Sequence, residues 1–204
     1  NIALVNELAI FAHQLGVNVW ESIEAAGTKP FGFMKFTPGP GVGGHCLPVD
    51  PSYLSWQVRR KLGQNFRFVE LANDVNNHMP DYVLQRVIAM LNQEGKALKG
   101  AKVLLVGLAY KKNSGDIRES PSLRTIELLR EYGADIVAVD DNVADYRWPT
   151  GVRRVSLTST EVGTSDVVIL VTDHDDLDLA ALEESETPVL DTKNRASGLN
   201  VHQL

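Results

Sequence analysis

The stretch VLLVG at residues 103–107 decides the fold of this sequence. A continuous apolar run of this kind, ended by glycine, is typical of a parallel β-strand buried on both faces of its sheet. Proline and glycine then delimit a helix over residues 121–133. Further apolar runs predict strands at residues 136–139, 167–171 and 189–190. Strands that alternate with helices predict βαβ units, so we expect a Rossmann-like parallel α/β domain over residues 97–204.

The residues before this domain are predicted to be mostly helical. Asn18 and Glu21 have the spacing of a capping box, and Asp50 followed by proline is typical of a helix start. Pro80 is likewise expected to open a helix. Together with apolar residues at helical spacing, these signals predict helices over residues 1–15, 18–27, 50–63, 65–77 and 80–94. We place a domain boundary at about residue 97 and expect an all-helical domain over residues 1–96.

The composition is that of an ordinary globular protein, with 44% hydrophobic and 23% charged residues in a chain of 204. A net charge of −6 argues against a nucleic-acid partner, because such proteins are usually basic. No apolar run approaches the roughly 18 residues that a membrane span needs, and no secretory leader is expected. A single cysteine cannot form an internal disulfide, which favours a cytoplasmic protein. The chain starts inside a helical pattern, so we expect it to be a piece of a longer polypeptide.

Residues 28–49 interrupt the helical pattern with several prolines and glycines. A long loop inside a compact region is usually functional or disordered. Gly43 and Gly44 lie just before the only thiol, Cys46, and glycines let a backbone approach a ligand closely. A thiol near the start of a helix gains thiolate character. The alternative is a buried free cysteine beside a structural turn, and His45 is interpreted as a loop-packing residue.

Residues 38–51, PGPGVGGHCLPVDP, resemble the catalytic-cysteine motif of the UDP-glucose/GDP-mannose dehydrogenase family. Residues 1–7, NIALVNE, are similar to the start of that family's long dimerisation helix. Residues 108–121, LAYKKNSGDIRESP, are similar to the loop after the first strand of its UDP-binding domain. The resemblance extends, in order, over essentially the whole chain. The segments KPFGFMKF and DPSYLSW, which flank the cysteine motif, look most like members that act on UDP-N-acetylhexosamines.

The resemblance implies an NAD-dependent nucleotide-sugar 6-dehydrogenase that serves polysaccharide precursor synthesis. Members oxidise the C6 alcohol of a UDP-sugar to a carboxylate in two hydride transfers to NAD. Cys46 would add to the intermediate aldehyde as a thiohemiacetal, which is oxidised to a thioester that water hydrolyses. Asp50 matches an active-site aspartate that would orient or deprotonate water, although a plain helix cap is an equal alternative from the sequence.

The resemblance also implies that part of the enzyme lies outside this chain. The family's catalytic lysine and asparagine would fall about two turns before Asn1, and the NAD-binding domain would lie further upstream. No GxGxxG follows the first strand, where the fingerprint would have to stand, because Gly107 stands alone there. We therefore expect the NAD site to lie mostly in a missing N-terminal domain and the fragment to be inactive alone.

Other positions match the family's substrate and cofactor contacts. Arg118 matches an arginine that reaches NAD, since a guanidinium suits a phosphate, although a pair with Asp116 or Glu119 is the alternative. Lys111 matches a substrate lysine, with a solvated loop lysine as the alternative. Lys193 stands where the family has an arginine, so a single ammonium group replaces the two-pronged guanidinium there. The implied substrate contacts are Lys29 (from a neighbouring subunit), Phe36, Gly39, Gly41, Gly43, Gly44, Lys111 and Lys193.

No metal site is expected from the sequence. The histidines outside the cysteine motif lack metal-ligand spacing, and with one cysteine there is no zinc pattern; they are His13, His78, His174 and His202. The acidic residues 173–178 resemble a calcium loop only in composition, without its glycine and terminal glutamate. We predict a solvated helix start there.

Two further functions and one mode of assembly follow as hypotheses. The chain alone is either the substrate half of an enzyme or a non-catalytic module that dimerises and binds UDP-sugars. A thiol redox protein is less favoured, because no resolving cysteine accompanies Cys46. The first helix has apolar residues on more than one face, which favours burial on all sides. Since the family pairs these helices across a two-fold axis, we predict a homodimer.

Overall fold

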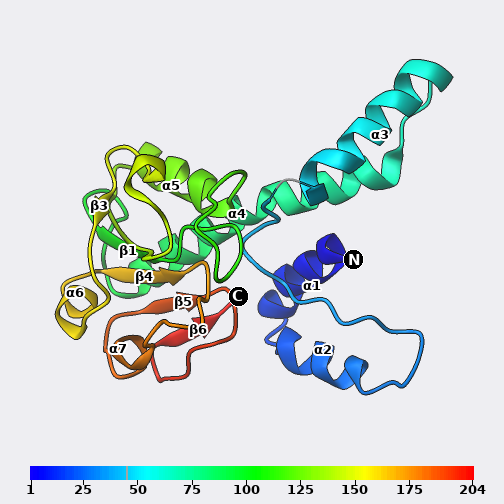
Figure 1. Cartoon of the computed structure of the whole chain (residues 1–204). Helices are drawn as coiled ribbons and strands as arrows, with labels where there is room; N and C mark the ends of the chain where they lie inside the picture. Colours follow the sequence, from blue (N-terminus) through cyan, green and yellow to red (C-terminus); the bar gives the residue numbers. More distant parts are fainter. Residues whose placement is uncertain (45) are drawn as a thin grey trace.

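The structure, a computed structural model, describes residues 1–44 and 46–204, which form a sheet-containing part and a helical part (Figure 1). The helical part contains α1 (Ile2–Gln14), α2 (Val19–Gly27), α3 (Cys46–Leu62) and α4 (Arg67–Gln93). The last of these helices passes from the outer end of the helical part into the sheet-containing part. The predicted combination of helices followed by a parallel α/β fold is confirmed. The exact division at about residue 97 stays a prediction.

In the described residues, parallel strands form one six-stranded sheet in the order β3-β2-β1-β4-β5-β6. The strands are β1 (Lys102–Val106), β2 (Asp135–Val139), β3 (Arg153–Arg154), β4 (Val167–Leu170), β5 (Val189–Asp191) and β6 (Val201–Gln203). In the centre, Val103 of β1 is in register with Ile136 of β2 and with Val167 of β4. This is the strand order of dinucleotide-binding Rossmann folds, in which ligands bind at the carboxyl ends of the strands where the order reverses, here between β1 and β4.

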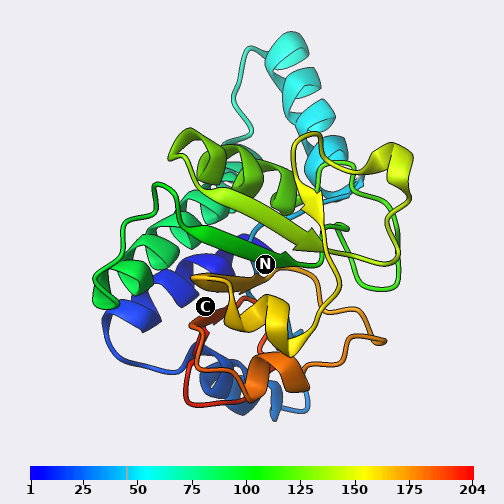
Figure 2. The same cartoon turned by 90° about the vertical axis from the view of Figure 1, so that its left-hand side faces the viewer.

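Alternate side chains of the central strand form the cores on the two faces of the sheet. Val103 and Leu105 point toward α4 and α5 (Pro121–Glu131) and join the apolar residues of those helices. Leu104 and Val106 point the other way, toward α6 (Ser159–Gly163) and α7 (Ala180–Glu183). Figure 2 shows these two pairs of helices on opposite sides of the strands. All four strand residues are fully buried, as the apolar run predicts for a parallel strand.

The longer elements of the sheet-containing part are confirmed, and the short ones were missed. β1, β2, β4, β5 and α5 lie where the sequence predicts them, and Asn18 caps α2 with its side chain, as expected. β3 and β6 are edge strands of two and three residues. The helix α6, the helix α7 and the 3₁₀ turn η1 (Asp145–Arg147) are also short. Elements of this length have too few residues for a periodic pattern to be recognised.

The prediction of separate helices over residues 65–77 and 80–94 is wrong, because α4 continues through Pro80. Pro80 has no N–H, so the carbonyl of Asn76 lacks its usual helical donor. Burial of the next turns against the sheet keeps the helix continuous, since Met79 and Val83 are fully buried. The chain preceding Cys46 crosses α4 here, because a Cβ added to Gly41 would lie 3.5 Å from the Asn76 carbonyl oxygen.

The prediction that Asp50 and Pro51 open a helix is also wrong, because α3 begins at Cys46. Pro48 lies in the first turn, where a missing N–H breaks no helical hydrogen bond. Pro51 lies further inside the helix, next to Ser52, whose hydroxyl donates to the Pro48 carbonyl at 3.0 Å. Asp50 is therefore not a helix cap; it lies one turn after Cys46 on the same side of α3.

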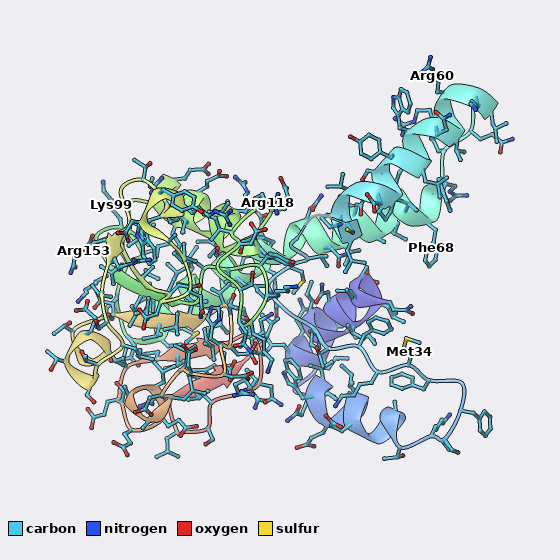
Figure 3. The ribbon with its side chains drawn as sticks, viewed as in Figure 1. Met34, Arg60, Phe68, Lys99, Arg118 and Arg153 are labelled. Carbon is cyan, nitrogen blue, oxygen red and sulfur yellow. The ribbon has the colours of Figure 1, made fainter. Side chains whose placement is uncertain are left out.

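Residues 46–78, which comprise α3 and the first half of α4, form a helical arm that projects from the rest of the molecule (Figure 1). An ion pair between Arg59 and Glu70 links its two helices at 2.5 Å. Figure 3 shows Arg60 near its tip and Phe68 on its surface. Large apolar side chains of the arm are exposed, among them Leu47, Tyr53, Leu54, Trp56, Leu62, Phe68 and Leu71. The arm thus leaves a large amount of apolar surface in water.

Candidate functional site

The cysteine loop, defined as residues 36–44, packs against the loop that follows β1. A Cβ on Gly43 would lie 2.8 Å from the carbonyl oxygen of Glu119 and 2.8 Å from the Cβ of Tyr110. Gly44 has φ of +90°, and a Cβ there would lie 2.7 Å from the Tyr110 ring. Both positions therefore require glycine, one by contact alone and the other also by backbone conformation. The two motifs that the sequence singled out, far apart in the chain, are in direct contact.

The other end of the cysteine loop meets Lys193, which follows β5. A Cβ on Gly39 would lie 3.4 Å from the Lys193 Nζ, and the backbone N–H of Lys193 donates to Asp191 at 2.8 Å. Burial lowers the pKa of Lys193, while the charges of Asp173 and Asp191 act in the opposite direction. The structure therefore brings two predicted substrate residues, Gly39 and Lys193, together from different parts of the chain.

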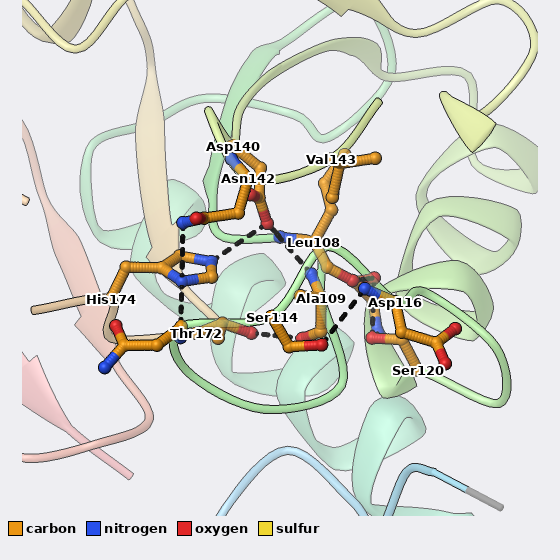
Figure 4. A network of polar contacts seen from close by, with 12 residues as sticks. Leu108, Ala109, Ser114, Asp116, Ser120, Asp140, Asn142, Val143, Thr172 and His174 are labelled. Carbon is orange, nitrogen blue, oxygen red and sulfur yellow. Dashed lines mark hydrogen bonds and ion pairs between the residues drawn. The ribbon is translucent and has the colours of Figure 1, made fainter. Parts of the chain in front are cut away.

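The β1–α5 loop, residues 107–120, is fixed by a buried polar network at the carboxyl ends of three strands (Figure 4). Asp140, directly after β2, accepts from the N–H groups of Leu108 and Ala109 at 2.7 and 2.9 Å. His174, after β4, lies with Nε2 3.1 Å from Asp140 Oδ2, and its Nδ1 accepts from the N–H of Asn113 at 3.0 Å. The loop is thus held through its backbone N–H groups.

The ionisation of this pair depends on the same contacts. Burial alone would raise the pKa of Asp140, but the hydrogen bonds from His174, Leu108 and Ala109 outweigh burial and hold that pKa below 3.8. Burial alone would lower the pKa of His174, but the hydrogen bond and charge of Asp140 raise it. Asp140 and His174 are 1% and 2% exposed, so these contacts act with little screening by water.

The carboxyl edge between β1 and β4 does not fit a dinucleotide. In dinucleotide-binding folds, glycines after the first strand bring backbone N–H groups to the pyrophosphate. Here Gly107 has φ of +87°, and a Cβ on it would overlap the backbone of Thr172. The Thr172 hydroxyl donates to the Ala109 carbonyl at 2.6 Å, and the nearest N–H groups already bind Asp140. The strand order of the fold is present, but the crevice is filled by protein.

Arg118 lies at the junction of the two parts (Figure 3) and is held by Asp116. Its Nη2 is 2.6 Å from the Asp116 carboxylate, and Arg147 approaches the same carboxylate at 3.7 Å. The hydrogen bond from Arg118 lowers the pKa of Asp116 to about 2. Lys111 is exposed, with its Nζ 5.4 Å from the centre of the Tyr110 ring. The sequence offered the pair with Asp116 as the alternative for Arg118, and that pair forms; a contact with NAD stays a prediction.

Cys46 and Asp50 are both exposed near the amino end of α3, where the helix dipole favours negative charge. An open cavity of about 350 Å³ is lined by Leu47 and Pro51, the residues that follow them, together with Phe36, Val42 and parts of α1 and α4. A second, of about 420 Å³, lies between α4, the cysteine loop and the start of α5. Phe36 also packs against the small core of α1 and α2. The thiol is therefore accessible from solvent, and the residue after it, Leu47, lines a cavity.

Comparison with known proteins places both parts of the chain. Residues 1–78 match the model of the central domain of the UDP-glucose/GDP-mannose dehydrogenase family, and residues 104–197 match the model of its UDP-binding domain. The chain belongs to this family. Its cysteine loop therefore lies in the family's central domain, and Lys111, Arg118 and Lys193 lie in the UDP-binding domain.

Within this family, individual proteins are similar to nearly the whole of the chain. The chain is 36% identical over 202 residues to UDP-N-acetyl-D-mannosamine dehydrogenase of Methanococcus maripaludis, which covers 95% of this chain and 44% of the relative. Among solved structures it superposes on UDP-D-ManNAc dehydrogenase from Pyrococcus horikoshii with a TM-score of 0.79 and 29% identity, over 99% of this chain and 47% of the other. The UDP-N-acetyl-mannosamine dehydrogenase from Staphylococcus aureus gives 0.74 and 31%, over 99% and 45%. The chain thus spans less than half the length of these relatives.

Some predicted features of this family member lie apart from the site or differ from expectation. Lys29 is exposed on the segment 28–35, which runs outward beyond α2 and carries Met34 (Figures 1 and 3). The interpretation of His45 concerns a residue outside those that the structure describes. The acidic residues 173–178 form a loop that leads into α7, and Asp178 accepts from the N–H of Ala180 at 3.1 Å, as predicted for a helix start. Asp175 binds Lys112 at 2.8 Å and thus supports the β1–α5 loop.

Metal clusters and membrane-spanning helices are both absent from the part of the chain that the structure describes. Its histidines, cysteine and acidic residues form no group of three or more that could hold a metal ion. None of the helices in residues 1–44 and 46–204 combines the length and apolar character needed to cross a bilayer.

Several residues of the site were missed by the sequence reasoning. Asp140 directly follows a predicted strand, and Thr172 and His174 follow another. Because the carboxyl ends of parallel strands meet at one edge of the sheet, this position after each strand was an available signal. Asn6 and Asn76, which contact each other and hold the cysteine loop, carry no such signal, because asparagines on helices are usually solvated.

Proposed function

We propose that this chain is the substrate-binding, thiol-carrying half of an NAD-dependent dehydrogenase that oxidises C6 of a UDP-sugar to the uronate for polysaccharide precursors. UDP-N-acetylmannosamine is the first candidate substrate, because relatives at 36% and 31% identity carry that sugar in their names. The observation that carries the proposal is the contact of the cysteine loop with the UDP-binding domain, at Tyr110 for Gly43 and Gly44 and at Lys193 for Gly39.

In the proposed reaction the Cys46 sulfur attacks the C6 aldehyde carbon and forms a C–S bond. The carbonyl electron pair moves to oxygen, which takes a proton, and a thiohemiacetal results. After its oxidation to a thioester, water attacks the same carbon, the C–S bond breaks and the thiol is restored. Asp50, one turn from Cys46 on α3, is proposed to orient or deprotonate that water.

NAD, when bound, would accept the hydride in both oxidation steps. Because the edge between β1 and β4 is filled by Gly107 and Thr172, we assign the dinucleotide site mainly to a segment of the whole protein outside this chain. Arg118 is the residue of this chain proposed to reach the cofactor, since a guanidinium can bind a phosphate through two N–H groups at once. The hydrogen bond from Arg118 to Asp116 would fix the orientation of that guanidinium.

The substrate is proposed to lie along the edge where the cysteine loop meets the β1–α5 loop. Lys111 and Lys193 supply positive charge for the diphosphate, and the glycines of the cysteine loop supply bare backbone for the sugar. The proposed backbone contacts and the ring beside them are those of Phe36, Gly39, Gly41, Gly43 and Gly44. Lys29 is proposed to act from a second copy of the chain, because its outer segment lies away from this chain's own site.

A homodimer formed through the helical domain is part of the proposal. One support is an apolar groove of about 330 Å³ along α1 and α2, lined by Leu4, Leu8, Phe11 and Leu15, which are 47–77% exposed. Apolar surface of this extent is usually covered by a partner. Sedimentation equilibrium would show a dimer whose dissociation depends on concentration, whereas a monomer at every concentration would contradict the proposal.

Because Cys46 is the only thiol of the chain, its alkylation tests the proposal at a single site. We expect UDP-N-acetylmannosamine to slow the reaction of Cys46 with iodoacetamide in proportion to its occupancy, with GDP-mannose as the control nucleotide-sugar. The affinity from protection should equal the affinity from calorimetry. Binding without protection would remove Cys46 from the sugar pocket, and absence of binding would refute the UDP-sugar assignment.

A non-catalytic module that binds UDP-sugars is the second candidate for the chain by itself, favoured by the filled dinucleotide crevice at Gly107. NADH formation separates the two. The catalytic proposal expects NADH and uronate from UDP-N-acetylmannosamine when the chain is joined to the preceding segment of its protein, and none from a Cys46→Ser variant of the same polypeptide. Binding with no turnover in either polypeptide would favour the module.

A further inference from the structure

We propose that Asn6 is a positioning residue that fixes the cysteine loop at Gly39 and thereby sets the geometry of the sugar-binding backbone. The inference rests on the proposed function, since it names a residue that acts on that same site without touching the reacting atoms. Asn6 lies on α1, well before the loop in the sequence, and its side chain is fully buried.

The amide of Asn6 ties three segments together. Its Oδ1 accepts from the backbone N–H of Gly39 at 2.9 Å, and its Nδ2 donates to Asn76 Oδ1 on α4 at 3.0 Å. The two bonds determine which way the amide faces, because a rotated amide would turn its NH₂ group toward the Gly39 N–H. α1, the cysteine loop and α4 therefore share one polar contact inside the protein.

The hydrogen bond between Asn6 and Asn76 lies at a turn of α4 in which one backbone carbonyl lacks its helical donor. Pro80 removes the donor that the Asn76 carbonyl would otherwise have, and Gly41 packs over this carbonyl. On the opposite side, Gly39 touches the end of Lys193 from the UDP-binding domain. Gly39 is thus the point at which both domains hold the loop, and Asn6 supplies the hold from the helical side.

Glycines give this loop a particular need for such a fixed point. Four of the six residues from 39 to 44 are glycines, and glycine has the largest conformational freedom to lose. Side chains that could anchor the loop are missing at those positions, so its course depends on contacts made by the backbone. Asn6 makes a buried hydrogen bond to that backbone, seven residues before the thiol of Cys46.

Asn6→Leu tests the inference, because it keeps the branching of the side chain at Cγ and removes both hydrogen bonds. We expect the Gly39 amide to exchange its hydrogen at least tenfold faster and the affinity for UDP-N-acetylmannosamine to fall about tenfold. Asn6→Asp should restore both values to within about threefold, since the carboxylate accepts from Gly39 and the Asn76 amide can rotate to donate. Ser55→Ala is the control, because it removes a hydrogen bond from α3 to Glu70 on α4, away from the loop.

The outcomes separate a positioning role from a structural one. Faster exchange at Gly39 with unchanged affinity would overturn the inference, as would unchanged exchange. If Asn6→Leu does not fold, Asn76→Ala replaces it, and the same two measurements should move in the same direction by a smaller factor. If the wild-type chain binds no UDP-sugar, the proposed function fails. In that case alkylation of Cys46 decides: a rate changed more than about threefold by Asn6→Leu supports positioning, and an equal rate overturns it.

Discussion

The two loops that meet at the candidate site are held in place in different ways. The β1–α5 loop is held from beneath, by Asp140 and His174 at the ends of neighbouring strands. The cysteine loop is held from its sides, by Asn6, by the contact with Lys193 and by the close approach of Gly43 to Glu119. The first set of contacts lies within one sheet, whereas the second joins separate parts of the chain.

This difference separates the contacts that determine the free energy of unfolding from those that determine substrate affinity. Contacts within the sheet form whenever the UDP-binding domain folds, so damage to them should lower the free energy of unfolding. Contacts of the cysteine loop with Tyr110, Glu119 and Lys193 form only when both parts pack, so damage to them should lower substrate affinity more than stability. The following variants break or sharpen this comparison, in order of their expected effect on stability.

Gly107→Ala is expected to have the largest effect, about 3–5 kcal/mol of unfolding free energy. The residue would need φ of +87°, and its Cβ would overlap the backbone of Thr172, which cannot yield as a side chain could. Gly100→Ala is the matched control, because Gly100 has φ of +82° and open space around it. Urea denaturation should show about 1–2 kcal/mol for the control. Equal losses in the two variants would contradict the packing argument.

Asp140→Asn should cost about 2–4 kcal/mol at neutral pH, because an amide cannot accept from all the donors that surround the carboxylate. The pKa of Asp140 is lower in the folded chain than its ordinary 3.8. Its contribution is therefore complete above about pH 4 and is lost as the pH falls through the lowered folded value. Because Asp140 also raises the pKa of His174, the difference in unfolding free energy between wild type and variant should grow as the pH falls through the raised pKa of His174, and shrink again once Asp140 takes up a proton in strongly acidic solution. A difference that did not change with pH would refute the ionised pair.

The sequence predicts the repetitive parts of this molecule well and the exceptions poorly. The apolar run at 103–107 and the runs after it predict the central strands and their parallel arrangement, because burial on both faces leaves a direct mark on composition. The helix boundaries predicted at Pro80 and Asp50 were wrong. In both cases a local signal for a helix start was overridden by packing of the surrounding turns, which no single residue reveals.

The residues of the candidate site likewise fall into those that the sequence predicts and those that it does not. The glycine-rich approach to Cys46 and the loop after β1 stand out in the sequence, and the structure places them in contact. Their supports do not stand out, because Asn6, Asp140 and His174 act through hydrogen bonds to distant backbone groups. Such bonds depend on where the chain passes in three dimensions, and neither composition nor periodicity records this.

Gly44→Ala should cost less stability than the first two variants, about 1–2 kcal/mol, although its φ of +90° is equally unusual. The atoms that its Cβ would meet belong to the Tyr110 ring, and a side chain can rotate away. We expect the affinity for UDP-N-acetylmannosamine, measured by calorimetry, to fall by more than tenfold because the loop moves off its partner. A double-mutant cycle with Tyr110→Ala should recover part of the lost stability. Full additivity would show that the ring contact is not the cause.

Lys112→Ala is expected to have the smallest effect and marks the lower limit of the comparison. Lys112 pairs with Asp175 at 2.8 Å, but both side chains are about half exposed, 47% and 56%, so water and salt screen their attraction. Asn113 also binds Asp175, at 2.6 Å, and keeps the acidic segment against the β1–α5 loop after the lysine is removed. The free energy of unfolding should change by no more than the error of urea denaturation, at low and at high salt alike. A clear loss at low salt that disappears at high salt would show that the β1–α5 loop depends on surface charge as well as on the buried pair beneath it.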